Sequence, residues 1–232
     1  MQLAWDRLSF VSQSRQYDDP CGIARALDLI GDRWALLVVR ELIFGPKRFA
    51  QLRSGLHSVS PNVLSQRLRE LEAAGVVRRG MLAPPASVAV YELTDRGRAL
   101  EPVLVELGRW GSQEPIRTSR ELTADAFLVA LKTAFDVSAA PAGDVTFELG
   151  IDDETFTVMV SGGSLEITRG RRGQPAVSLR GDAATMRRIA FGREPIDVAE
   201  QAGRLTVEGD RDLAEAFTRM FPVRRPELSA TT

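Results

Sequence analysis

The chain has 232 residues, of which 44% are hydrophobic and 26% charged, and its formal net charge is −1; these values are typical of a globular protein with one large or two small domains. One cysteine and one histidine exclude a zinc site built from several Cys and His ligands, and neither a GxxxxGK[ST] loop nor a GxGxxG fingerprint is present. Without a signal peptide, a long apolar run or a cysteine pair, the sequence predicts a cytoplasmic protein that does not insert into a membrane and holds no metal or cofactor.

Residues 1–19 carry little hydrophobic periodicity and are predicted to form an arm. From Cys21 onward the apolar spacing is helical, since Ile23, Leu27 and Ile30 repeat at i, i+4 and i+7. Two further helices are predicted from the same kind of spacing: Trp34, Leu37, Val38 and Leu42, then Phe49 and Leu52. The dipeptide Gly45-Pro46 ends the second of these helices.

A fourth helix is predicted from Ser60, an N-cap residue followed by Pro61, to Ala74, with Gly75 as its left-handed stop. Its buried stripe consists of Leu64, Leu68 and Leu71. Four polar residues point away from that stripe: Asn62, Ser65, Gln66 and Arg69. The helix therefore presents amide, hydroxyl and guanidinium groups to its surroundings.

Two strands, 76–79 and 88–93, are predicted to form a hairpin around an uncharged tip that contains Pro84-Pro85. Thr94 then caps one long helix that reaches Trp110. The apolar stripe of this helix is wide for an exposed terminal helix, which indicates packing on a second subunit.

Basic residues gather between Lys47 and Arg79, where seven Lys and Arg accompany two acids and give a local charge of +5 (7 − 2). Three helices followed by a hairpin is the order of a winged helix-turn-helix, whose recognition helix fits the major groove of double-stranded DNA. The predicted base contacts are Asn62, Ser65, Gln66 and Arg69. The predicted phosphate contacts are Lys47, Arg48, Arg53, Ser60, Arg78 and Arg79. The alternative is that these polar groups only solvate a surface.

The pattern changes after residues 115–121, which are predicted to be a linker between a first domain (20–114) and a second (122–224), followed by a tail (225–232). The second domain has helical patterns at 122–135, 182–191 and 212–221. Its alternating strands are predicted at 145–149, 155–160, 164–168, 175–180 and 204–208. The predicted fold class is α+β, with helices flanking an antiparallel sheet.

The first half resembles the HxlR-type winged-helix regulators in the blocks CGIARALDLIGDRWALLVVREL, GPKRFAQL, SPNVLSQRLRELEAAGVVRR and YELTDRGRALEPVLVELGRWG. The resemblance implies a homodimer that binds a palindromic operator, with residues 22–30 and 95–111 at the dimer interface. Wings of this family carry a basic residue after the paired prolines, whereas this tip reads MLAPPAS. The difference argues against insertion of the wing into the minor groove.

The second half resembles the sterol carrier protein type two domain, above all at AGRLTVEGD followed by an apolar helix. That resemblance implies an apolar tunnel for a hydrophobic small molecule or lipid, which would modulate DNA binding. The residues predicted to line it are Phe147, Phe156, Val158, Ile189, Phe191, Phe217, Met220 and Phe221. The alternative is that they form the ordinary core of an α+β domain.

Three other functions are open at this point. A lipid carrier would use the first half only for assembly. A thiol-based redox sensor would use Cys21, which stands where the HxlR-like family often has a cysteine; the alternative for Cys21 is a packing residue. An enzyme is disfavoured, since the acids Asp152, Asp153 and Glu154 fit a turn beside Gly150 better than a catalytic site.

Overall fold

The structure is a computed structural model that describes residues 17–82 and 88–222. Most of the expected N-terminal arm, the wing tip at 83–87 and the expected tail lie outside the described residues. In the first half the described elements are α1 (Gly22–Ile30), α2 (Ala35–Leu42), α3 (Phe49–Gly55), α4 (Pro61–Ala73), β1 (Val77–Met81), β2 (Ala89–Leu93), α5 (Asp95–Arg98) and α6 (Glu101–Gly111).

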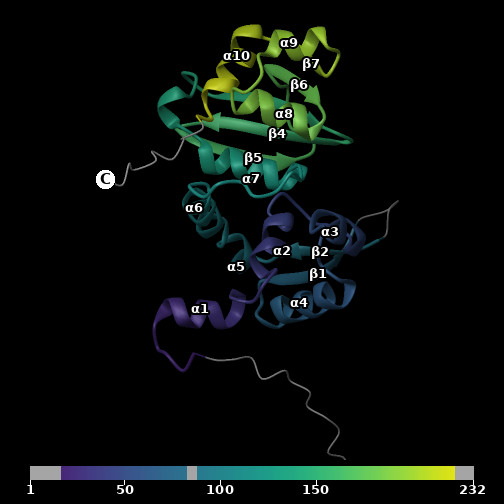
Figure 1. The fold of residues 1–232 in the computed structure, drawn as a ribbon, viewed down its shortest axis with the longest axis vertical. Helices are drawn as coiled ribbons and strands as arrows, with labels where there is room; N and C mark the ends of the chain where they lie inside the picture. The colour runs from purple at the N-terminus through teal and green to yellow at the C-terminus, as the bar shows by residue number, and fades with distance from the viewer. Residues whose placement is uncertain (1–16, 83–87, 223–232) are drawn as a thin grey trace, which may run out of the picture.

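The helices of the first half and the wing share one apolar cluster, to which α2 contributes Val38, α3 Leu52, α4 Leu68 and β2 Leu93. β1 and β2 pair antiparallel, so the predicted hairpin is confirmed. Helix α1 contributes only Ile30 to this cluster, because two of its side chains, Ala24 and Ile30, are buried and the rest of the helix projects from the body (Figure 1).

The long helix predicted after Thr94 is wrong, because the segment contains two helices, α5 and α6. Thr94 caps the first, its Oγ1 accepting a hydrogen bond from the Gly97 backbone N–H at 3.1 Å. Pro102 lacks an N–H and clashes with the preceding turn, so it stands in the first turn of α6 rather than inside a continuous helix. Gly97 is tightly packed, since a Cβ there would lie 2.1 Å from the Val76 carbonyl oxygen.

In the second half the described elements are α7 (Ala124–Ala134), a short 3-10 helix η1 (Val137–Ala139), β3 (Val145–Ile151), β4 (Glu154–Ser161), β5 (Ser164–Arg169), β6 (Val177–Gly181), α8 (Ala183–Ala190), α9 (Ile196–Gln201), β7 (Leu205–Gly209) and α10 (Arg211–Arg219). Within the described residues the sheet has five strands in the order β5-β4-β3-β6-β7. It is mixed rather than antiparallel as predicted, because β3 and β6 run parallel. The α+β fold class is confirmed.

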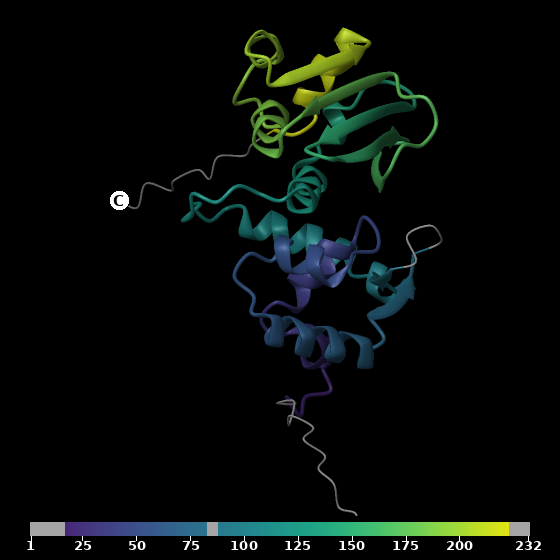
Figure 2. The same ribbon diagram turned by 90° about the vertical axis from the view of Figure 1, so that its right-hand side faces the viewer.

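The sheet has one apolar and one polar face. Alternate residues of β3 such as Phe147 and Leu149 are buried in the core, which α8 and α10 cover (Figures 1 and 2). On the other face Glu148 binds Arg171 and Arg180. This division is the usual one for a sheet that packs on one side only.

The two halves meet along α7, which packs against α6 and α2 (Figure 1). Phe44, which follows α2, belongs to the core of the second half and packs edge-on against Phe156, with ring centroids 6.4 Å apart. The halves are therefore joined through apolar packing as well as through the chain.

Candidate nucleic-acid interface

Helix α4 has the boundaries and the two faces that the sequence predicts. The Ser60 Oγ accepts a hydrogen bond from the Val63 backbone N–H at 3.3 Å, Pro61 occupies the first turn, and Gly75 has a left-handed φ of 68°. The three predicted leucines are fully buried. These local signals satisfy the free N–H groups of the first turn and stop the helix after Ala73.

The polar face of α4 is partly organised by its own side chains. Asn62 and Arg69 are exposed, whereas Ser65 and Gln66 are half-buried. Gln66 Nε2 donates to Glu70 at 2.7 Å, and its amide oxygen accepts from Arg69. The predicted base-contacting set therefore lies together on one surface, and Glu70 is a further polar neighbour of this set.

Four of the predicted phosphate-contacting arginines are exposed. Arg48 is the N-cap of α3, and Arg53 lies in the last turn of that helix, before the turn that leads to α4. Arg78 Nε donates to Glu92 at 3.0 Å, and Arg79 lies 3.4 Å from Glu72 and over the Tyr91 ring. Exposed pairs of this kind are weak, so phosphate can compete for both wing arginines.

Lys47 is not available for DNA, and the prediction that it contacts phosphate is wrong. Its side chain is 7% exposed, and its Nζ lies 2.8 Å from Glu41 Oε2 and 2.5 Å from Asp125 Oδ2. Its backbone exchanges two hydrogen bonds with Tyr91, at 3.0 and 2.8 Å, which attaches this segment to the wing. Lys47 thus links the wing to the second half of the chain and does not face a ligand.

The buried charges around Lys47 form a cluster across the two halves. Glu41 also binds Arg40 at 2.7 Å, and Asp125 binds Arg169 at 2.6 Å. Burial raises the pKa of the Asp125 carboxyl despite Lys47 and Arg169. Burial also opposes ionisation of Glu41, but the charges of Lys47 and Arg40 and their hydrogen bonds hold its pKa below the usual value.

The sequence contained a signal for this cluster that was missed. Glu41 follows the buried Val38 by three positions in α2, and Asp125 precedes the buried Leu128 by three positions in α7. Helical periodicity therefore places both acids on buried faces, where an ionised carboxylate needs a cation. The cation that both carboxylates bind is Lys47, which the sequence analysis assigned to phosphate contact instead.

The predicted ligand-lining residues of the second half are packed together. Seven of the eight are fully buried and Phe191 is half-buried. The Phe217 ring lies 5.4 Å from Phe147 and 5.1 Å from Phe221, centroid to centroid. These residues form the apolar core under α8 and α10, as the alternative interpretation had it. The tunnel for a hydrophobic molecule therefore remains a prediction.

The first half matches known regulators. The profile of the HxlR-like helix-turn-helix family matches residues 29–118. YvaP of Bacillus subtilis (strain 168), an uncharacterized HTH-type transcriptional regulator, is 39% identical over 89 residues, which is 38% of this chain and 82% of YvaP. The chain belongs to the HxlR-like family.

Two further comparisons of the first half give similar sequence identities. The HTH-type transcriptional regulator YodB of Bacillus subtilis (strain 168) is 36% identical over 88 residues, 38% of this chain and 79% of YodB. The structure of the redox regulator HypR in its oxidized form covers 41% of this chain and 99% of its own, with 34% identity and a TM-score of 0.38.

The second half matches a different profile, that of the alkyl sulfatase C-terminal domain, over residues 113–227. The expected sterol-carrier identity of this half is therefore still a prediction. Within residues 17–82 and 88–222, no helix has the length and hydrophobicity that a bilayer crossing needs.

Cys21 stands at the N-cap of α1 in this HxlR-like chain and is exposed in the single chain, without the burial that the packing alternative implies. Its backbone N–H donates to Asp19 Oδ1 at 2.8 Å. Redox sensing by Cys21 stays a prediction. The acids Asp152 and Asp153 occupy the turn between β3 and β4, as expected, and Glu154 binds Arg169.

Proposed function

We propose that this chain is a homodimeric transcriptional regulator, acting on DNA in the cytoplasm, whose α4 helix reads base edges in the major groove. The supporting observation is the outward face of α4, where Asn62, Gln66 and Arg69 lie together while the leucine stripe is buried. Asn and Gln pair bidentately with adenine, and Arg pairs with guanine. Arg48, Arg53 and the wing arginines are exposed and are suited to phosphate oxygens.

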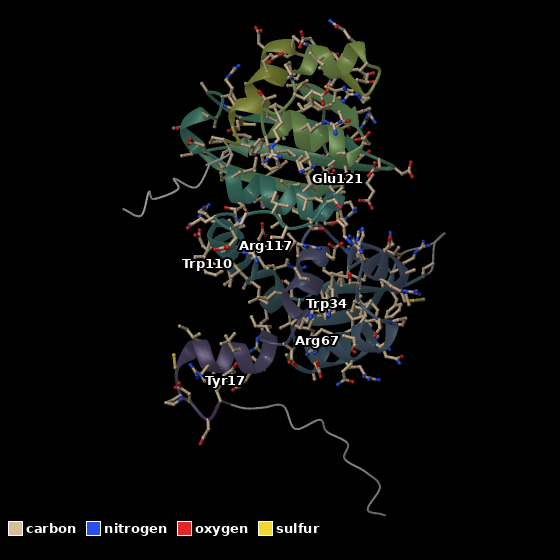
Figure 3. The ribbon with its side chains drawn as sticks, viewed as in Figure 1. Tyr17, Trp34, Arg67, Trp110, Arg117 and Glu121 are labelled. Carbon is tan, nitrogen blue, oxygen red and sulfur yellow. The ribbon has the colours of Figure 1, made fainter. Side chains whose placement is uncertain are left out.

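A second copy of the chain is the proposed occupant of an apolar surface formed by α1 and α6. These helices lie on one side of the molecule, left in Figure 1, and Trp110 stands at the edge of α6 in Figure 3. Ile23 is 71% exposed and Trp110 69% exposed, and Leu27, Val103 and Leu107 are also exposed. A nine-residue helix such as α1 is not stable alone, so its apolar side needs a partner. Twofold symmetry then implies a palindromic operator.

The DNA contacts are tested by selecting duplexes from a random pool with the wild-type protein and titrating the enriched duplex with variants. We expect Asn62→Ala and Arg69→Ala to lose about 1–3 kcal/mol each and to relax the preference at one base position. Arg53→Ala should weaken all duplexes alike and reduce the salt slope by about 1. Arg172→Ala removes an exposed charge from the second half and is the control. A pool without an enriched sequence, or equal binding by the α4 variants, contradicts the proposal.

The dimer is tested by sedimentation of the intact chain. Ile23→Glu places a charge on the proposed interface and should yield monomers. Ile116→Glu is the matched control, because Ile116 is 73% exposed but lies outside both helices. A wild-type monomer at micromolar concentration, or dissociation by both variants alike, contradicts this assignment.

A further inference from the structure

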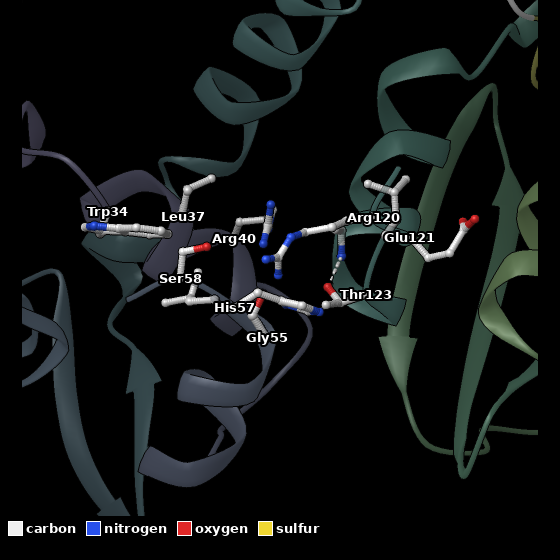
Figure 4. Close-up of a pocket in the computed structure, with 12 residues that line it drawn as sticks. Trp34, Leu37, Arg40, Gly55, His57, Ser58, Arg120, Glu121 and Thr123 are labelled. Carbon is white, nitrogen blue, oxygen red and sulfur yellow. Dashed lines mark hydrogen bonds between the residues drawn. The ribbon is translucent and has the colours of Figure 1, made fainter. Parts of the chain in front are cut away.

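A small cavity lies between the turn of the helix-turn-helix motif and the segment that leads into α7. One wall is the stretch 55–58, which joins α3 to α4, and the opposite wall is the stretch 120–123 together with Ala126 (Figure 4). The cavity measures about 170 Å³. The cavity therefore borders the turn that sets the position of α4, and its opposite wall belongs to the segment that begins the second half of the chain.

The polar lining of this cavity has one positive charge in excess. The guanidinium groups of Arg40 and Arg120 are turned toward one another (Figure 4). Arg40 belongs to the buried cluster, whose cations Arg40, Lys47 and Arg169 pair with Glu41, Asp125 and, at its partly exposed edge, Glu154. Among the residues that line the cavity, the two arginines Arg40 and Arg120 stand against the one carboxylate of Glu121, which leaves +1 (2 − 1).

No carboxylate among the described residues neutralises Arg120. Within residues 17–82 and 88–222 its guanidinium has no ion pair, and its backbone N–H donates to Thr118 at 3.2 Å. Glu121 also lines the cavity but binds Arg187 at 2.6 Å. Two guanidinium groups that face one another repel, and an anion between them removes this repulsion.

The remaining lining is apolar and includes Trp34, Leu37 and Leu122. A cavity of about 150 Å³ accommodates benzene, so this one has room for a single ring or a short chain that carries an acidic group. Arginine binds a carboxylate through two parallel hydrogen bonds. The combination of two guanidinium groups with an indole and two leucines selects an organic acid over an inorganic anion.

We infer that this cavity binds a small organic carboxylate, with the carboxylate on Arg120 and Arg40 and the apolar body against Trp34 and Leu37. The site lies outside the core of the second half, where a hydrophobic ligand was expected. Its coupling to DNA rests on the proposed function. A ligand here touches the α3–α4 turn directly and reaches the wing through Arg40, Glu41 and Lys47.

Binding is tested on the intact protein without DNA, by calorimetry with benzoate, benzamide and inorganic phosphate. Benzoate should bind with a Kd of about 1 mM or tighter, and the neutral benzamide and phosphate at least about tenfold more weakly. Arg120→Gln should weaken benzoate binding about tenfold or more, while its unfolding midpoint stays at the wild-type value because Arg120 makes no ion pair with the residues that the structure describes. Arg117→Gln, exposed and outside the cavity, should bind like the wild type.

Equal binding of benzoate and benzamide, or wild-type benzoate affinity in Arg120→Gln, overturns the carboxylate site. Tighter binding of phosphate than of benzoate means a general anion site and also overturns it. Coupling is measured separately, as the DNA affinity with and without saturating benzoate. We expect a change of about tenfold, which requires a difference of 1.4 kcal/mol between the two states. Benzoate binding with unchanged DNA affinity overturns the coupling alone, whereas absence of sequence-specific DNA binding overturns the proposed function alone.

Discussion

At the scale of single residues, Lys47 and Arg48 show how neighbours of the same charge take different roles. Arg48 is exposed beside α3, whereas the Lys47 side chain is buried between Glu41 and Asp125. Two carboxylates removed from water need a cation, because an uncompensated buried charge costs several kcal/mol. Lys47 is therefore a structural residue within a segment whose other basic residues face solvent.

Replacing Lys47 by methionine keeps the length of the side chain and removes its charge. We expect Lys47→Met to lose about 3–5 kcal/mol of unfolding free energy at neutral pH, measured by urea denaturation. Arg48→Met, the exposed neighbour, should stay within about 0.5 kcal/mol of the wild type.

The loss in Lys47→Met should also depend on pH. Burial raises the pKa of Asp125 already in the wild type, and the pKa rises further once the cation is gone. A carboxyl whose folded pKa exceeds its unfolded value binds more protons in the folded state, so acidification favours folding. The difference from wild type should therefore shrink as the pH falls toward the folded pKa. A pH-independent difference, or a loss below about 1 kcal/mol, contradicts this account.

At the scale of elements, Glu194 lies between the short helices α8 and α9 and binds arginines of α8 and of the segment before β7. Arg188 of α8 donates to Glu194 Oε2 at 2.7 Å, and Arg204, which directly precedes β7, donates to the same oxygen at 3.0 Å. Six-residue helices such as α9 depend on tertiary contacts of this kind. The hydrogen bonds from Arg204 and Arg188 lower the pKa of Glu194 to about 2.

Glu194→Gln should therefore lower the melting temperature at pH 6. The carboxyl has a depressed folded pKa, so its stabilising effect is present above the unfolded pKa of about 4.5 and disappears as the pH falls toward about 2. Scanning calorimetry between these pH values should show the two melting curves converging. Glu166→Gln on β5, where the side chain is exposed, is the control. A wild-type melting temperature for Glu194→Gln at pH 6 contradicts the role of these bonds.

At the scale of the whole molecule, the two halves share buried contacts and are expected to unfold together. Phe44 leaves the first half to pack against Phe156, and Arg169 lies over the same ring at 4.8 Å. The buried charge cluster, in which Asp125 binds Lys47 and Arg169, adds ion pairs to the same interface. A structural change in one half can therefore act on the other half through these side-chain contacts.

Phe44→Ala leaves a cavity at this interface and should lose about 3–5 kcal/mol. We expect the single calorimetric transition of the wild type to separate into two, because each half retains its own apolar cluster. Phe44→Leu keeps most of the volume and should keep one transition. A single transition in Phe44→Ala would show that the halves are coupled by other contacts.

Much of the fold was predictable because its signals are local. Helix α4 is marked by Ser60, Pro61 and Gly75, and the strands of the second half follow alternating patterns between glycine-rich turns. The long helix after Thr94 was mispredicted because the apolar stripe continues across the break between α5 and α6, whose first turn holds Pro102. The parallel pairing of β3 with β6 joins residues about 30 positions apart, as Phe147 with Val177, and short-range patterns do not encode it.

By itself the sequence determined helix α4, because N-cap, proline, leucine spacing and glycine act within a few residues of one another. It also determined which side chains α4 directs outward. Only the tertiary structure decided which basic residues remain free, since Lys47 meets Asp125 across 78 positions. The cavity between Arg40 and Arg120 likewise exists only after the halves pack. Charges act through space, and their partners are set by the fold rather than by the order of residues.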